Sequence, residues 1–306
     1  MLYFKSLTEA EEVLRALSAP MRLQIMELLY QNESMSMNDL AQKLQITNGA
    51  ISMHVSKLEE AGLVRIRSTS GKRGTMKLVS ARYDRLMIDM AKEHENSKCY
   101  VDDIRIGYYT AFSCTPTCGL ATAKSIVGSL DDIRAFTFPE RFQAGILWFS
   151  TGYVEYSLPN HLQKRQRLKE LQISFEISSE CPGTNDEYPS DIEFSINQTL
   201  LGCWTSPGDY GKRKGFVSPG WWSDTLNQYG LLKTLIINSE GTFMDGSQKL
   251  SDVTIEDLQI DSNAQIILRF EVSKKMQHCG GCTLFGEEFG DYAQGIRIKA
   301  YYDTIQ

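Results

Sequence analysis

The sequence predicts an α+β protein with two domains, residues 1–95 and 104–306. In the first part, apolar residues recur every three or four positions, which is the period of an amphipathic helix. In the second part they alternate with polar residues, and Pro-Gly and Asp-Gly pairs punctuate the runs, which is typical of antiparallel strands. The polar stretch Glu93–Asp103 lies between the two patterns and is the predicted boundary.

Four helices are predicted in the first domain before residue 64. Thr8–Leu17 and Pro20–Tyr30 each place leucines and other apolar residues on one face. Ser36–Leu44 and Ile46–Val64 follow, joined by a tight turn at Gln45-Ile46. Two helices joined by such a turn have the spacing of a helix-turn-helix, whose second helix enters the major groove of DNA.

The segment Ile46–Val64 has the features of a DNA-recognition helix. Thr47 or Asn48 can cap its start, and Gly62 suits a left-handed residue at its end. One side is an apolar stripe of Ile51, Val55 and Leu58. The other side is mostly small or polar, which permits a close approach to base edges, and carries Gly49, Ser52, Met53, Ser56 and Lys57.

A β-hairpin is predicted directly after this helix. Val64–Arg67 and Thr75–Leu78 alternate as strands around the basic tip Gly71-Lys72-Arg73-Gly74. A basic hairpin beside a recognition helix forms a wing, whose cations bind phosphates without reading sequence. The candidate phosphate contacts are Lys57, Arg65, Arg67, Lys72 and Arg73.

A fifth helix is predicted after the wing, because apolar residues recur with helical spacing. The residues that define it are Tyr83, Leu86, Met87, Met90, Ala91 and His94. Its apolar face would either close the core of the domain or form a dimer interface.

Charge is distributed unevenly along the chain. The net charge is −6, which argues against non-specific affinity of the whole molecule for nucleic acid. Between Lys43 and Arg85, however, nine Lys and Arg residues outnumber three Asp and Glu residues. A basic segment on an acidic chain is compatible with DNA binding on one face only.

The first third of the chain resembles the winged-helix domain of ArsR-type bacterial transcriptional regulators. The segments that carry the resemblance are Ala16–Leu29, the two helices of the helix-turn-helix, and Glu59–Val64. The resemblance implies that Thr47, Asn48, Ser52 and His54 contact double-stranded operator DNA, while Met53 stands where the family has a basic residue. The family's best-known metal site uses cysteines on the helix before the recognition helix, and Met37–Leu44 has none. The resemblance also implies a homodimer formed through the first and last helices.

The second domain is predicted to be an antiparallel β-sandwich of jelly-roll type. No long helical pattern separates its strands. The predicted strands are Gly145–Phe149, Tyr153–Leu158, Leu171–Ile177, Ile192–Ile196, Leu231–Asn238, Ile266–Val272 and Ile296–Tyr302.

A ligand site is one hypothesis for the second domain. Tyr153–Pro159 and Asp191–Asn197 resemble, in pattern only, galactose-binding and other carbohydrate-binding sandwich modules. The candidate ligand-binding residues are Trp204, Asp209, Trp221 and Trp222, which lie in or beside the loop Ser206–Gly220. Aromatic planes beside polar groups could bind a small molecule such as a sugar, whereas the alternative is that the tryptophans are core and loop anchors.

The cysteines offer a second hypothesis, a structural zinc site. The candidate ligands are Cys114, Cys118, His278, Cys279 and Cys282, and Cys279-Gly-Gly-Cys282 has zinc-knuckle or redox spacing. The same thiols could instead form an oxidation-sensitive disulfide or be small buried apolar residues. A metal site or an oxidation-sensitive disulfide at these cysteines would make the protein a metal- or redox-responsive regulator.

An enzyme is the competing class. Glu155, Glu176 and Glu193 lie on predicted strands and could serve a jelly-roll catalytic domain, but no metalloprotease, phosphate-loop or nucleophile-elbow motif appears. The chain shows no basic-then-apolar leader and no run long enough to span a bilayer. We therefore expect a cytoplasmic, dimeric regulator without catalytic activity or membrane attachment, whose second domain senses a small molecule or stabilises the dimer.

Overall fold

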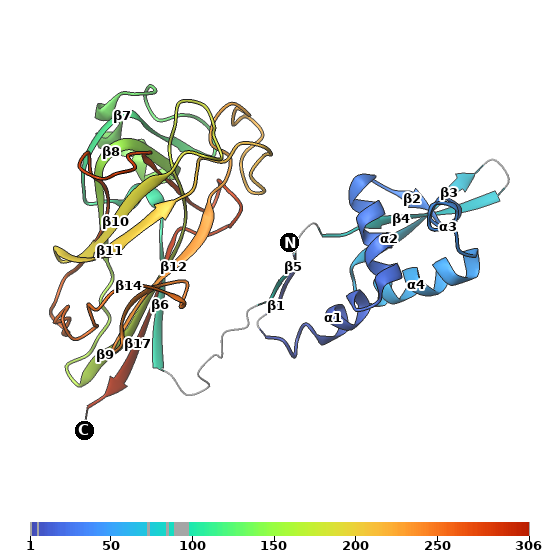
Figure 1. The fold of residues 1–306 in the computed structure, drawn as a ribbon, viewed down its shortest axis with the longest axis horizontal. Helices are drawn as coiled ribbons and strands as arrows, with labels where there is room; N and C mark the ends of the chain where they lie inside the picture. The colour runs from blue at the N-terminus through green and yellow to red at the C-terminus, as the bar shows by residue number, and fades with distance from the viewer. Residues whose placement is uncertain (1, 5, 72–73, 84–85, 89–97, 306) are drawn as a thin grey trace. The chain divides into compact units, whose positions relative to one another are not determined.

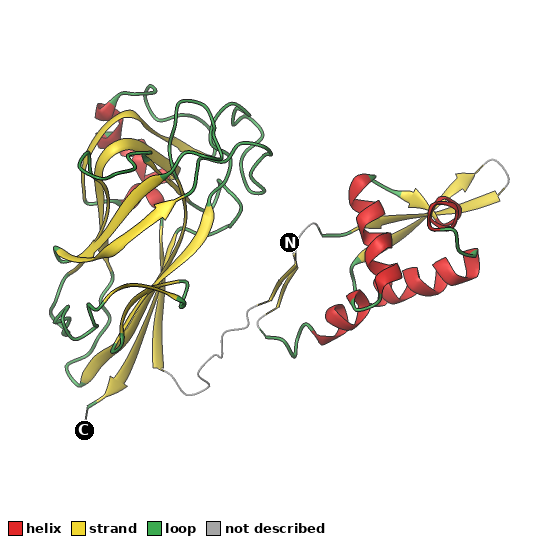
Figure 2. Cartoon of the chain, viewed as in Figure 1, coloured by secondary structure: helices red, strands yellow, loops and turns green. Residues whose placement is uncertain are grey.

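The computed structural model describes residues 2–4, 6–71, 74–83, 86–88 and 98–305. Contacts divide the chain into two compact units, residues 1–95 and 96–306. Figure 1 traces both units along the chain, and Figure 2 shows that the helices are concentrated in the first unit and the strands in the second. Each unit is described by itself.

The first unit is a winged helix-turn-helix. Its helices are α1 (Glu11–Leu17), α2 (Pro20–Gln31), α3 (Met37–Leu44) and α4 (Asn48–Glu60), and its three-stranded sheet has the order β2 (Met35–Ser36), β4 (Gly74–Ala81) and β3 (Val64–Gly71). β3 and β4 pair antiparallel along their whole length and form the wing hairpin. The four predicted helices and the predicted hairpin are confirmed.

Local hydrogen bonds explain where α3 and α4 begin and end. Ser36 Oγ accepts the N–H of Asp39 at 3.1 Å, and the Asp39 carboxylate accepts the N–H of Ser36, which completes a capping box. Thr47 Oγ1 accepts the N–H of Ala50 at 3.3 Å at the start of α4. Gly62 follows α4 with φ +72°, as its place after the last turn predicts.

The predicted fifth helix is wrong where the structure describes it. Leu86–Ile88 forms the strand β5, which pairs parallel with β1 (Leu2–Phe4). Leu86 packs against the core of the first unit together with Leu2 and Phe4, so pairing with a distant segment overrides the local helical spacing. Met90, Ala91 and His94 lie outside the described residues.

The second unit is built from twelve strands that pair only antiparallel. One layer has the order β11 (Thr199–Ser206), β10 (Ser190–Ile196), β15 (Ile266–Val272), β8 (Ala144–Leu158) and β7 (Ala111–Thr122). The other has the order β6 (Lys98–Ile104), β17 (Ile296–Thr304), β9 (Gln166–Ser178), β12 (Leu231–Asn238), β13 (Gly241–Met244) and β14 (Gln248–Ser251). β16 (Cys282–Phe285) bonds to both β8 and β9 and so joins the layers.

These pairings confirm the antiparallel, sheet-rich second domain, and its jelly-roll type stays a prediction. Its sheet begins earlier than the predicted limit at residue 104, because β6 pairs with β17 from Lys98 onward. Short 3-10 helices lie at Ile106–Tyr108, Ile133–Thr137 and Pro139–Gln143. Within the described residues, no helix has the length and apolar character that crossing a bilayer requires.

β8 is one continuous strand where the sequence predicts two. Gly152 interrupts its apolar pattern with φ +118°, and a Cβ there would lie 1.7 Å from the carbonyl oxygen of Ser113 on β7. Glycine therefore allows the two backbones to stay paired through this irregular position. The long strand places β7 on one side of β8 and β15 and β16 on the other.

Aromatic side chains from both layers form the centre of the second unit. Phe175 of β9 packs edge-on against Phe270 of β15, with ring centroids 4.9 Å apart. Phe194 of β10 and Tyr156 of β8 also contact Phe270. All four side chains are fully buried, so the two layers share one core.

We expect Leu268→Ala to destabilise the second unit by about 2–5 kcal/mol, because Leu268 on β15 is fully buried and its truncation leaves a cavity. Leu200→Ala is the matched control, since Leu200 on β11 is 52% exposed and should change stability by less than about 0.5 kcal/mol. Urea unfolding followed by tryptophan fluorescence reports on this unit alone, because all four tryptophans lie in it. Equal losses in both variants would contradict the proposed core.

Candidate DNA-binding interface and other predicted sites

The face of α4 that does not pack into the first unit is exposed and mostly polar. Ile51, Val55 and Leu58 are fully buried, so the helix has one fixed inner side. The predicted DNA contacts that lie exposed on or just before this helix are Thr47, Asn48, Ser52, Met53, Ser56 and Lys57. An exposed helix face next to a hairpin is the arrangement by which a winged helix enters the major groove.

Two predicted contacts differ from the rest, Thr47 just before α4 in its hydrogen bonding and His54 on α4 in its burial. The Thr47 oxygen already accepts the Ala50 N–H, so its hydroxyl hydrogen and one lone pair remain for contacts with DNA. His54 is half-buried, and its Nδ1 is enclosed without a hydrogen-bond partner among the described residues. His54 therefore lies at the edge of the exposed face and not at its centre.

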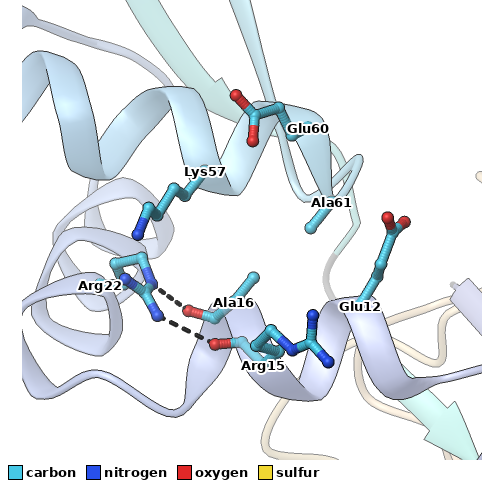
Figure 3. A pocket seen from close by; sticks show the side chains of 7 residues that line it. All are labelled: Glu12, Arg15, Ala16, Arg22, Lys57, Glu60 and Ala61. Atoms are coloured by element: carbon cyan, nitrogen blue, oxygen red, sulfur yellow. Dashed lines mark hydrogen bonds between the residues drawn. The ribbon is translucent and has the colours of Figure 1, made fainter.

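Lys57 lies beside a cavity of about 230 Å³ between α1, α2 and α4 (Figure 3). The Arg22 guanidinium in this cavity donates to the carbonyl oxygens of Ala16 and Arg15, the latter at 2.9 Å, and so ties the end of α1 to α2. Lys57 extends toward Arg22 in the same view. The lining residues carry both signs of charge, with Glu12 and Glu60 as the acids, so the cavity does not select ligands of one sign.

The wing distributes its cations over both faces of the sheet. Val64 is buried and Arg65 and Arg67 are exposed, so alternation places both arginines on the face turned away from the core. Lys77 stands opposite Ser68 on the paired strand and therefore shares the core-side face with Val79. The motif pattern did not single out Lys77, although its charge was visible. Lys72 and Arg73 lie outside the described residues.

The first unit is a winged-helix DNA-binding domain by its fold and its exposed recognition helix. Residues 19–65 match the model of a family described as bacterial regulatory protein, arsR family. The first domain is therefore an ArsR-type winged helix, and the chain carries the DNA-binding domain of a transcriptional regulator.

Solved structures similar to parts of the chain include reduced HlyU from Vibrio cholerae N16961. It is 28% identical, and the match covers 24% of this chain and 70% of that chain with a TM-score of 0.21. The transcriptional regulator HlyU from Vibrio vulnificus CMCP6 shares 27% identity over 25% of this chain and 75% of its own, with a TM-score of 0.22. Dimeric latent PorU from Porphyromonas gingivalis is 11% identical over 68% of this chain and 13% of its own, with a TM-score of 0.25. No curated protein matches the chain.

The four predicted ligand-binding residues lie in different surroundings. Trp204 packs in the main core under Lys233, while Trp222 belongs to a second apolar cluster with Phe289. Trp221 is 40% exposed and donates its Nε1 hydrogen to the carbonyl oxygen of Ala123. The basic residues of the intervening loop also have partners, since Lys212 pairs with Asp186 and Arg213 with Asp291.

The five candidate zinc ligands lie in different environments. Burial raises the pKa of the Cys118 thiol to about 11 and also raises the pKa values of the Cys114 and Cys282 thiols, which favours neutral thiols in the metal-free protein. Cys279 is exposed, and its thiol contacts two backbone carbonyls. His278 Nδ1 lies 3.2 Å from both carboxylate oxygens of Asp191. Among the described residues, no group of three or more such ligands could hold a metal ion, and all seven cysteines are free.

Two of the three glutamates considered for catalysis have partners of their own in the fold. Glu155 forms an ion pair with Arg269 at 2.6 Å. Glu176 is fully buried and accepts backbone N–H groups, including that of Gly230 at 2.8 Å, and burial raises its pKa to about 8. The pKa of Glu193 is raised by burial and by Glu271. The contacts of Glu155 and Glu176 therefore give these two carboxylates a structural role.

Asp209 is the candidate ligand residue with the clearest pH-dependent role. Its side chain is fully buried, one oxygen accepts the Cys181 N–H at 3.0 Å, and the other has no partner among the described residues. Burial raises the pKa of Asp209 to about 7. The folded protein therefore binds this proton more tightly than the unfolded chain, and stability is lost as the pH rises toward 7.

We expect Asp209→Asn to remove part of this pH dependence. Between pH 5 and 7 the wild type should lose on the order of 2 kcal/mol of stability relative to the variant, because only the wild type must ionise a buried group. Urea unfolding of both proteins across this range measures the difference. Asp224→Asn is the matched control, since Asp224 is an exposed carboxylate of the same unit and should give the wild-type profile. Parallel curves for the wild type and Asp209→Asn would show that Asp209 is ionised throughout.

Proposed function

We propose that the protein is a sequence-specific transcriptional regulator that binds operator DNA as a homodimer in the cytoplasm, with a second domain that senses a small molecule and has no catalytic role. The observation that carries the DNA-binding part is α4, whose buried apolar side forces a polar, exposed side outward within an ArsR-type domain. Asn48, Ser52 and Ser56 on this side read base edges, and Thr47 donates at the start of the helix.

Phosphate contacts come from the cations around the recognition helix. Lys57 lies on α4 itself, and Lys77 lies on the core-side face of the wing. The wing-tip residues Lys72 and Arg73 complete the set, while Arg65 and Arg67 reach phosphates only where DNA wraps past the outer face of the sheet. Each such contact releases counterions and makes binding depend on salt.

We expect Lys57→Ala to weaken binding similarly on all DNA sequences and to reduce the slope of log affinity against log salt by about 1. Ser52→Ala should instead leave the slope unchanged and relax the preference at one base pair, because it removes a polar group that faces the bases. Fluorescence anisotropy with a DNA fragment selected by the protein from a random library measures both. Lys274→Ala, an exposed lysine of the second unit, is the control. An unchanged slope in Lys57→Ala would exclude Lys57 as a phosphate contact.

The homodimer is proposed because one winged helix reads only one half-site, and two copies related by a two-fold axis read a palindromic operator. Exposed apolar residues on or beside α1 and α2 support an interface there. They are Leu7 at 51%, Leu14 at 39% and Leu23 at 45% exposure.

We expect light scattering to give twice the chain mass of 34.6 kDa, and footprinting to show two half-sites separated by one or more helical turns of roughly 34–36 Å. Leu14→Glu should shift the particle toward the monomer, because it places a charge in the interface. Leu130→Glu, with a similarly exposed leucine in the second unit, should not. A monomeric wild type that binds a single half-site with full affinity would contradict the proposed dimer.

Sensing by the second domain requires that a ligand bind two states of the regulator with different affinity, since only then does it change operator binding. The second domain has the size and buried core of an independent unit, which supports a role beyond holding the winged helix. A sugar is the ligand that the sequence pattern suggests.

A further inference from the structure

The second domain contains a cavity of about 100 Å³, and Trp222, one of the four candidate ligand-binding residues, lies in its wall. It is bounded by β7, β8, the loop after β9 and the segment 222–227. The residues that matter for its chemistry are Thr117, Asp131, Trp148, Glu180, Trp222 and Asn227. Pro182 and Gly183, both exposed, also line it, so the cavity opens to solvent at that loop.

Glu180 is held firmly in the wall of this cavity. It is only 8% exposed, and three donors fix its carboxyl group. Thr117 Oγ1 lies 3.1 Å from Oε1, while Asn227 Nδ2 and Thr283 Oγ1 lie 2.9 and 3.0 Å from Oε2. Because Oε1 receives one of these bonds and Oε2 receives two, Oε1 has the greater capacity to accept a further donor.

The cavity is acidic and has no compensating cation in its wall. Glu180 and the exposed Asp131 line it, and none of the lining residues is Lys, Arg or His. Asp209 is fully buried, and one of its oxygens has no partner among the described residues. Both Asp209 and Asp131 repel a negative charge on Glu180. Burial is the main cause that raises the pKa of Glu180, and these carboxyls contribute. A cation in the cavity would relieve this repulsion.

Two indole rings form the apolar part of the wall. Trp148 and Trp222 have centroids 5.9 Å apart at an interplanar angle of 64°. Gly119 lets Trp148 lie directly on the backbone of β7, where a Cβ would come within 2.4 Å of the ring. Trp222 already donates its Nε1 hydrogen to the carbonyl oxygen of Asn227 at 2.8 Å. Fixed indole rings attract cations through their faces.

We propose that this cavity binds the ammonium group of a small organic amine, with Glu180 and Asp131 as its charge partners and Trp148 and Trp222 as its aromatic wall. The volume is smaller than the roughly 150 Å³ that encloses benzene, so it accommodates an ammonium group and a few carbons but no sugar ring. Anions are disfavoured by the two carboxyls. Among the described residues no group of three or more ligands for a metal ion is found.

The amine would be the ligand of the sensing role proposed above, and the regulatory meaning of this inference rests on that role. Binding at the cavity itself does not require DNA. The two claims can therefore be tested separately on the same full-length protein.

The binding test is a titration of the full chain with n-propylammonium chloride, followed by tryptophan fluorescence at constant ionic strength. 1-Propanol is the neutral probe of the same size, and glucose and galactose are the sugar probes. A saturable response is expected for propylammonium alone, because the alcohol lacks the charge and the sugars exceed the cavity.

Three variants locate the site. Glu180→Gln keeps the size of the side chain but cannot ionise when a cation binds, and Leu130→Lys places a cation in the wall at an exposed position. Both should weaken propylammonium binding by roughly tenfold or more. Leu200→Lys is the matched control, because Leu200 is similarly exposed, at 52% against 49%, and lies outside the cavity. If Glu180→Gln does not fold, Leu130→Lys against Leu200→Lys decides the question.

The proposal is overturned if propylammonium gives no saturable response, if 1-propanol gives the same response, or if Leu130→Lys and Leu200→Lys bind alike. A saturable response to a sugar but not to the amine, lost in Leu130→Lys, would also overturn it and would assign the cavity to carbohydrate.

Operator affinity with and without propylammonium then tests the sensing role. A change in affinity that disappears in Leu130→Lys supports both claims. Amine binding without any effect on operator affinity leaves the cavity assignment standing and overturns sensing through it.

Discussion

The burial of one side of α4 is the constraint on which the DNA-binding domain depends. Ile51, Val55 and Leu58 pack into the same core as Leu40 of α3, so the angle between the two helices is fixed by packing. Since the inner side of α4 is fixed, its outer side is fixed as well. The apolar stripe therefore determines which residues of α4 are exposed and so available for the proposed DNA contacts. Hydrogen bonds at Ser36 and Thr47 set where both helices begin.

In the second domain, the residues that stabilise the fold and those proposed to bind a ligand lie in different places. Its core is apolar and aromatic across both layers, and β16 ties the layers together beside the acidic cavity. Glu180 lies in the wall of that cavity and Asp209 lies close to it, and burial raises the pKa of both carboxyl groups, as it does for Glu176 elsewhere in the same unit. The proposed ligand would favour the ionised form of Glu180, because a cation offsets part of the cost of burying a carboxylate.

Sequence patterns predicted the structure correctly where residues close together in the chain determine it. Helix caps, the turn between α3 and α4 and the wing hairpin depend on neighbours in sequence, and each formed as predicted. The fifth helix failed at Leu86–Ile88 because a partner strand more than eighty positions away decides its conformation. The candidate ligand residues Trp204 and Trp222 enter different apolar clusters, a separation that the sequence pattern did not predict.

The sequence by itself determined the class of the first domain, the recognition helix with most of its exposed residues, and the antiparallel character of the second domain. Those features follow from periodicity and from short-range hydrogen bonds. Only the tertiary structure decided which face of the wing carries Lys77, that Cys114 and Cys282 are buried thiols, and that Glu180, Trp148 and Asn227 meet at one cavity. Those residues come from separate strands and loops, and sheet pairing between distant segments, which no local pattern encodes, brings them together.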